Sequence, residues 1–153
     1  MIKEYEIDYS EQIPRLKVIN EYDFNEDMTD VGMIALFFME CLQVDEEQIE
    51  HIYVIAYDSK DKLIGICKIA DGDLSSANLD NKKIITFLVL SGGMQFLVEH
   101  NHPNGDSTPS QGDKFADGSL KVIAMMFNFK YLGGLVIGKG EYSVINNQEN
   151  VEI

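Results

Sequence analysis

The chain has 153 residues, of which 45% are hydrophobic and 25% are charged, and its formal net charge is −14 at pH 7. This length and mix are typical of one globular domain and exclude a disordered chain, and no apolar run approaches the ~20 residues that a membrane-spanning helix needs. An acidic surface of this kind also disfavours binding to nucleic acid, because it repels the phosphate backbone.

The N-terminal residues 1–17 are polar and acidic, so they do not have the pattern of a secretory signal. The sequence has two cysteines, Cys41 and Cys67, and each lies in an apolar segment. Two cysteines in a chain of this length indicate buried free thiols rather than a disulfide framework. We therefore expect a cytoplasmic protein with no attachment to a membrane.

Residues 1–45 are predicted to form a short strand-and-helix extension that packs on the rest of the chain. Residues 14–24 favour an extended lead-in with one edge strand. Residues 29–42 favour a helix, because Thr29 or Asp30 can cap its start and a broad apolar face follows.

Residues 46–153 are predicted to form the main domain, which opens with a hairpin. The β-branched and aromatic residues 51–57 favour a strand, and residues 63–69 favour its return after a polar turn. Residues 71–81 are rich in Asp, Ser and Asn and are expected to form a loop.

Residues 82–91 have the propensity for a strand, but the flanking residues favour a helix. Asp80 or Asn81 can cap its start, and Gly92-Gly93 can end it.

Residues 94–99 favour a buried strand, and residues 111–129 a helix with Phe115, Ile123 and Met126 on one side. Residues 132–138 and 142–146 favour two strands around a glycine-rich turn. The alternation of strands and helices predicts an α/β (α+β) domain with a single mixed β-sheet flanked by helices.

Two of the three histidines, His100 and His102, lie in the segment HNHPNGDSTPSQGD at the end of a predicted strand. Side chains two residues apart on a strand point to the same face, so both imidazoles converge. Asp113 adds a carboxylate. Three such ligands are typical of a catalytic zinc site, which leaves its fourth position open for water.

Each part of this segment also has a purely structural explanation. An H-x-H pair is often two polar residues at a strand end, and Ser110 with Asp113 forms the pattern of a helix start. These explanations do not account for two histidines directly before an Asp-bearing helix start.

The complete spacing, H-x-H followed by seven residues and S-x-x-D, resembles the JAB/JAMM (MPN) metalloprotease motif. Within this motif, the residues HNHPNGD, then TPS and D, resemble the RadC-like branch of that family. The resemblance extends from about Glu50 to Ser143. It implies a JAB/MPN-like (cytidine-deaminase-like) architecture and a zinc-dependent hydrolase that cleaves peptide or isopeptide bonds.

In that family an upstream glutamate acts as general acid/base, and Glu50 matches its position best, with Glu46 and Glu47 as alternatives. A plain surface carboxylate is an equally good explanation of Glu50 at this point. Glu99 ranks below it, because strand alternation turns its side chain to the face opposite His100. The resemblance implies that Ser110 stabilises the developing oxyanion.

Two departures from the family pattern bear on function. Gly133-Gly134 stands where RadC-like sequences usually carry an Asp-His pair, which places in doubt any role of that pair. The helix-hairpin-helix DNA-binding region that usually precedes the domain is absent from the short, acidic residues 1–45, so an association with DNA repair should not be transferred.

Two functions follow as hypotheses. The first is a zinc-dependent metallopeptidase or isopeptidase, with a peptide or protein as substrate. The second is a catalytically silent JAB-fold module that binds or scaffolds partners. In both, we expect no nucleic acid and no membrane as partner, and the sequence leaves open whether the chain forms a homodimer.

Overall fold

In the computed structural model, the described residues are 1–72 and 79–145, and they form seven strands, three α-helices and one 3-10 turn. The strands are β1 Ile2–Asp8, β2 Arg15–Tyr22, β3 His51–Tyr57, β4 Leu63–Asp71, β5 Gln95–Asn101, β6 Lys130–Gly138 and β7 Glu141–Ile145. The helical elements are α1 Val31–Glu40, η1 Val44–Glu46, α2 Asn81–Ser91 and α3 Gln111–Phe127.

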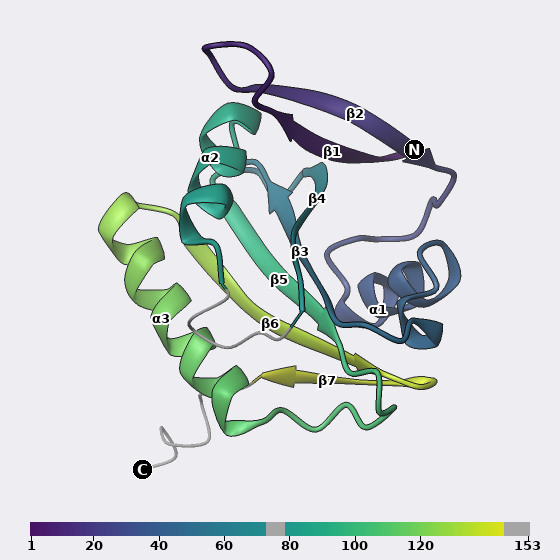
Figure 1. Cartoon of the computed structure of the whole chain (residues 1–153). Coiled ribbons are helices and arrows are strands. Elements are labelled where there is room, and N and C mark those ends of the chain that lie inside the picture. Colours follow the sequence, from purple (N-terminus) through teal and green to yellow (C-terminus); the bar gives the residue numbers. More distant parts are fainter. Residues whose placement is uncertain (73–78, 146–153) are drawn as a thin grey trace.

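The strands form one sheet in the order β2-β1-β4-β3-β5-β6-β7 (Figure 1). The pairs β1–β4 and β5–β6 are parallel and the remaining pairs are antiparallel. The predicted single mixed sheet flanked by helices is therefore confirmed. Strand β5 lies inside the sheet, between β3 and β6.

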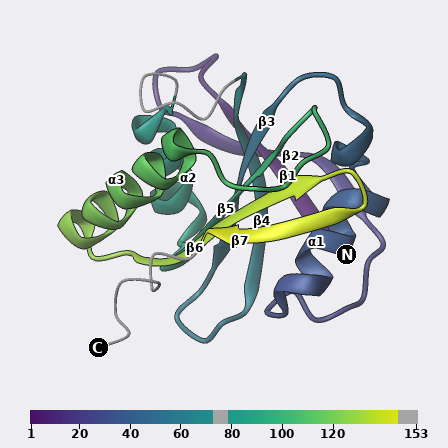
Figure 2. The same cartoon turned by 90° about the horizontal axis from the view of Figure 1, so that it is seen from below.

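The helices cover the sheet on two sides, with α1 on one face and α2 and α3 on the other (Figures 1 and 2). Strand β3 explains this arrangement, because its successive side chains point to opposite faces. Ile52, Val54 and Ala56 pack in a core cluster with residues of α2 and α3. Their neighbours on β3 pack in a second cluster with residues of α1. The sheet therefore separates two apolar layers.

The one strand predicted in residues 14–24 is confirmed as β2, whereas strand β1 was not predicted from the sequence. Its alternation is hidden by Glu4, a carboxylate at a buried position. Glu4 Oε2 accepts hydrogen bonds from Tyr22 Oη at 2.6 Å and from Asn20 Nδ2 at 3.1 Å. These partners on β2 satisfy the carboxylate. Residues 1–45 thus supply two strands of the sheet, while a division of the chain at residue 45 stays a prediction.

The helix predicted over residues 82–91 is confirmed as α2. The Asp80 side chain accepts a hydrogen bond from the Lys83 N–H and caps the start, and Gly92 ends the helix with a φ of 76°. Residues 73–78 of the predicted loop, and residue 146 of the last predicted strand, lie outside the described residues.

The helix predicted over residues 111–129 is confirmed as α3, but its buried face is not the one that carries Phe115 and Met126. Phe115 and Met126 are 65% and 72% exposed, and the buried face carries mainly small residues and aspartates. Its buried residues are Asp113, Ala116, Asp117, Leu120 and Ala124.

Both cysteines lie in the described part of the chain and are free, but only Cys67 is buried, whereas Cys41 is partly exposed. Among the described residues, we find no helix with both the length and the apolar character for crossing a bilayer.

Candidate metal centre

Strand β5 carries His100, and His102 follows it directly. His100 pairs with Ile52 of β3, whose side chain lies in the core cluster on the α2 and α3 face. The His102 N–H donates to the Ile137 carbonyl at 2.8 Å and continues the extended backbone past the end of β5. The two imidazoles therefore share one face, and their Nε2 atoms are 3.2 Å apart.

Asp113 reaches the imidazoles from the first turn of α3. The helix begins with a capping box in which Ser110 Oγ accepts from the Asp113 N–H at 3.0 Å and Asp113 Oδ2 accepts from the Ser110 N–H at 2.8 Å. The same Oδ2 lies 3.1 Å from His102 Nε2, and Oδ1 lies 3.3 Å from His100 Nε2. The helix start thus holds the carboxylate against both histidines.

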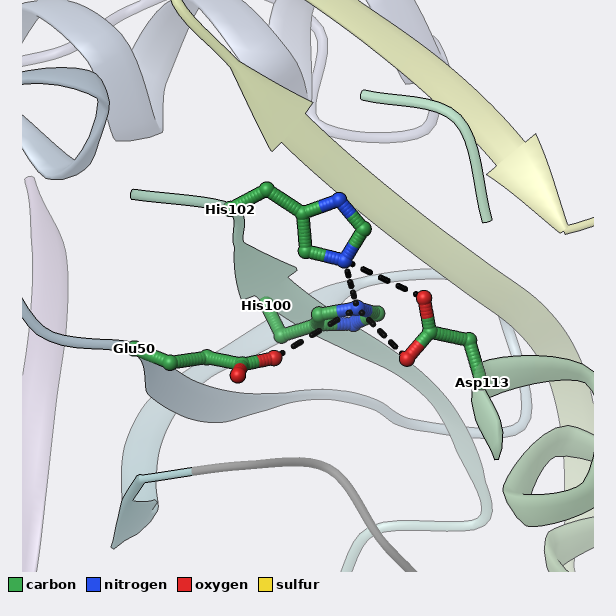
Figure 3. A group of neighbouring side chains, drawn as sticks. All are labelled: Glu50, His100, His102 and Asp113. Carbon is green, nitrogen blue, oxygen red and sulfur yellow. Dashed lines mark hydrogen bonds and ion pairs between the residues drawn. The ribbon is translucent and has the colours of Figure 1, made fainter. Parts of the chain in front are cut away.

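Glu50, the residue before β3, completes the group. Its Oε1 lies 3.7 Å from His100 Nε2, and its side chain is 14% exposed. Figure 3 shows the four side chains pointing toward one another. One ligand atom from each of Glu50, His100, His102 and Asp113 lies within 4.8 Å of the others, so this group could hold a metal ion. Imidazole nitrogen and carboxylate oxygen are donors that suit zinc.

A backbone carbonyl determines which nitrogen of His102 keeps its proton when the ring is neutral. Its Nδ1 lies 2.7 Å from the Asp106 carbonyl oxygen, which can only accept a hydrogen bond. Nδ1 therefore carries a proton, and in the neutral form of the ring Nε2 presents a lone pair to the centre, the arrangement in which imidazole ligates metals.

The environment keeps Asp113 ionised. Burial raises the pKa of this carboxyl, but the hydrogen bond from His100, the charges of His100 and His102 and the Ser110 N–H lower it, to about 2 in all. Asp113 is therefore a charged oxygen donor at neutral pH.

The segment between the histidines and α3 is docked on the turn between β6 and β7. The Lys139 N–H donates to the Gly105 carbonyl at 2.8 Å, and the Ser107 N–H donates to Glu141 Oε1 at 2.9 Å. Gly138 permits this approach, since a Cβ there would lie 2.4 Å from the Gly105 oxygen. The docking holds both the Asp106 carbonyl and the start of α3 in place.

A cleft of about 470 Å³ opens beside the four-residue group. Its lining is mostly polar and consists of Glu50, His102, Pro103, Asn104, Asp106, Thr108, Ser110 and Asp113. The Ser110 hydroxyl accepts from the Asp113 N–H, which leaves its own proton for a donor role.

The structure separates Glu50 from the other glutamates considered. Glu46 and Glu47 line a different cleft, next to Lys139. Glu99 pairs with Tyr53 and Leu135, which lie in the cluster on the α1 face, opposite the histidines. Glu50 alone of these four belongs to the group of donor atoms among the described residues. The catalytic roles of Glu50 and Ser110 stay predictions.

A side chain at Gly134 would have to displace the end of the Ile145 side chain. A Cβ there would lie 2.7 Å from Ile145 Cδ1 and 3.4 Å from Asp117 Oδ1. Asp117, one helical turn after Asp113, accepts a hydrogen bond from Tyr131 Oη at 2.6 Å. A histidine there, as in the family pattern, would therefore require Ile145 to move.

Comparison with known proteins agrees with this geometry. The model of the RadC-like JAB domain matches residues 28–150. A UPF0758 protein of Histophilus somni (strain 2336) is 25% identical over 125 residues, which are 82% of this chain and 55% of that protein. A UPF0758 protein of Chloroflexus aggregans is 29% identical over 108 residues, 71% of this chain and 46% of that protein. The chain thus spans about half the length of these relatives.

Proposed function

This chain belongs to the RadC-like JAB domain family, and on that premise we propose that it is a zinc-dependent hydrolase of the JAMM type that cleaves an amide bond in a peptide or protein. The observation that carries the proposal is the convergence of Glu50, His100, His102 and Asp113 beside an open cleft. When bound there, zinc supplies Lewis acidity, which polarises a carbonyl and brings the pKa of a coordinated water close to 7.

His100, His102 and Asp113 would hold the metal. Three protein ligands are typical of catalytic zinc sites, whereas structural sites close with four. His102 and Asp113 also line the cleft, so a substrate in the cleft lies next to the ligands.

Glu50 would accept the proton of the attacking water and pass it to the leaving amine. Its carboxylate lies 3.7 Å from His100 Nε2 and lines the cleft, which places it within one water of the ligands. The Ser110 hydroxyl would donate a hydrogen bond to the oxyanion that develops on the substrate carbonyl.

Metal analysis is the first test. Protein purified after growth with zinc should hold about one equivalent of zinc, because three protein ligands bind it firmly. Asp113→Ala should lose the metal. A content below about a tenth of an equivalent in the wild-type chain would contradict the zinc site.

Hydrolysis is the second test, with a panel of linear peptides and isopeptide-linked peptides. Glu50→Gln should keep the zinc and lower the rate about 100-fold or more, because it removes the proton acceptor alone. Glu46→Gln is the matched control, since Glu46 lies in the other cleft, and it should leave the rate unchanged. A zinc-loaded wild-type chain with no hydrolysis across the panel would favour the second function, a catalytically silent binding module.

A further inference from the structure

Asn101, which stands between the two histidines, is fully buried, and its side chain makes three hydrogen bonds to residues 44–51, which end at the first residue of β3. Its Oδ1 accepts from the His51 N–H at 2.6 Å. Its Nδ2 donates to the carbonyl oxygens of Val44 and Ile49, each at 3.0 Å. The side chain therefore connects β5 to a segment about 50 residues away in sequence.

Asn101 makes hydrogen bonds to the peptide groups on both sides of Glu50. The Ile49 carbonyl belongs to the peptide group before the Glu50 Cα, and the His51 N–H belongs to the peptide group after it. The Glu50 carbonyl, in that second group, also accepts from the Gly72 N–H at 2.7 Å. Because peptide groups are planar, fixing both of them fixes the φ and ψ angles of Glu50.

Glu50 needs such support, because it lies in neither a helix nor a strand. It follows the 3-10 turn η1 and precedes β3. A proton acceptor must be held within hydrogen-bond reach of its water, and a displacement of about 1 Å can lower a rate about 100-fold. The backbone at Glu50 therefore requires a contact that fixes its position relative to His100 and His102.

We propose that Asn101 is the positioning residue for Glu50. The tripeptide of His100, Asn101 and His102 presents two imidazoles on one face of β5 and the amide on the other. One strand end thus sets both the ligands and the backbone that carries the proton acceptor. The inference rests on the proposed function only in giving Glu50 that role.

The first measurement does not depend on activity. Asn101→Leu has nearly the same volume and removes all three hydrogen bonds, so the His51 N–H should exchange with solvent at least about tenfold faster in NMR hydrogen exchange. Gln95→Leu is the matched control. Gln95 is also buried on β5, but its Nε2 donates to the Asp58 carbonyl and to Asp61 Oδ1 at the other end of the strand. That variant should leave the exchange at His51 unchanged.

The second measurement is a double-mutant cycle on peptide hydrolysis. Asn101→Leu should lower kcat about 30-fold or more and keep the zinc affinity within about threefold of wild type. Combined with Glu50→Gln, it should lower kcat no further than Glu50→Gln alone, because Asn101 acts through Glu50. Gln95→Leu should leave kcat unchanged.

Unchanged exchange at His51 would overturn the proposal, as would multiplicative losses in the double variant or a zinc affinity reduced more than about tenfold.

If Asn101→Leu does not fold, Asn101→Asp replaces it. The aspartate keeps an acceptor for His51 and removes both donors. The Val44 carbonyl then loses one of its two partners, so the Glu47 N–H, which donates to the same oxygen, should exchange faster and kcat should fall. Unchanged kcat in Asn101→Asp would overturn the proposal. If the wild-type chain hydrolyses nothing, the proposed function fails, and the exchange at His51 still decides whether Asn101 holds the backbone at Glu50.

Discussion

The carboxylate of Asp113 belongs to two structures at once. Its Oδ2 accepts from the Ser110 N–H in the capping box and lies beside His102 Nε2. The helix start and the ligand set are therefore coupled through one side chain, although they make different chemical demands on it.

Asp113→Asn should separate these demands. The amide oxygen can still accept in the capping box, but the neutral amide loses the interactions with His100 and His102 that lower the pKa of Asp113 to about 2, so the free energy of unfolding in EDTA should fall by about 1–2 kcal/mol. The neutral amide is a weak zinc ligand, so zinc affinity should fall about 100-fold or more. Isothermal titration calorimetry with zinc measures the change in affinity, and urea unfolding measures the change in the free energy of unfolding. Asp80→Asn is the control, because Asp80 caps α2 outside the centre and should leave zinc affinity unchanged. Equal zinc affinity in Asp113→Asn and wild type would contradict the ligand role.

Glu99 is a second carboxylate with an unusual environment. It is fully buried, and among the described residues neither of its oxygens has a hydrogen-bond partner. Burial and the charge of Glu50 raise its pKa well above the ordinary range. Glu99→Leu replaces it with an apolar side chain of similar size and should raise the free energy of unfolding at pH 7 by about 1–3 kcal/mol.

The gain from Glu99→Leu should increase with pH. Above the ordinary glutamate pKa of about 4.3, the unfolded chain has lost a proton that folded Glu99 still holds because of its raised pKa. The stability of the wild-type chain therefore falls as the pH rises through this window, and the leucine variant lacks that loss. Urea unfolding at pH 5 and pH 7 measures the difference. Glu99→Gln should remove the pH dependence as well, and a larger gain at pH 5 than at pH 7 would contradict the argument.

The sequence predicted three of the four side chains of the centre from a local pattern, whereas Glu50 was matched only through the family resemblance. His100, His102 and Asp113 lie within one short segment, so strand alternation and a helix-start signal suffice to bring them together. Asn101 and the Asp106 carbonyl could not be found in that way. An asparagine between two histidines reads as a spacer until its distant partners are known, and a backbone carbonyl has no signature in sequence.

At the scale of elements, the segment between β5 and α3 depends on the turn after β6. Gly138→Ala should disturb it, because the added Cβ would lie 2.4 Å from the Gly105 carbonyl and 2.7 Å from the Ser107 nitrogen. The segment must shift, and we expect a loss of about 1–3 kcal/mol in unfolding free energy with weaker zinc binding.

Gly118→Ala is the matched control for Gly138→Ala. Gly118 lies inside α3, and a Cβ there meets no atom within 4 Å. It should raise the unfolding free energy by about 0.5–1 kcal/mol, because alanine favours the helix. Thermal unfolding of both variants measures the contrast, and equal stability of Gly138→Ala and wild type would contradict the close approach.

The elements also show where sequence patterns fail. The helix α2 was predicted despite its strand-like composition, because capping residues flank it. The strand β1 was not, because Glu4 takes a buried position whose partners lie on β2. For α3, the pattern placed large apolar residues on one side, whereas the chain packs small residues such as Ala116 and Ala124 against the sheet.

At the scale of the whole molecule, the net charge of −14 favours the binding of cations. A metal bound at the centre should also have a measurable effect on the stability of the folded chain. At 100 times its dissociation constant, a bound metal stabilises the folded chain by about 2.7 kcal/mol. Zinc should therefore raise the Tm by about 5 °C or more relative to EDTA. Differential scanning fluorimetry measures this shift.

Two comparisons make the thermal shift specific. Asp113→Ala should abolish it, and magnesium should produce little of it, because that ion prefers oxygen ligands to imidazole. An equal shift in Asp113→Ala would show that zinc binds elsewhere on the acidic surface. The absence of nucleic-acid binding stays a prediction at this scale, and the sequence leaves a homodimer open.

The parts of the centre differ in how far apart along the chain their residues lie. His102 and Asp113 are 11 residues apart, whereas His51 and Asn101, which join the Glu50 segment to β5, are 50 apart. The entropy lost on closing the longer loop is greater by about 1.3 kcal/mol at room temperature. The β5–α3 unit therefore closes at a lower entropic cost than the one at which the Glu50 segment docks. His102 and Asp113 form the local part of the candidate centre, and Glu50 its distant part.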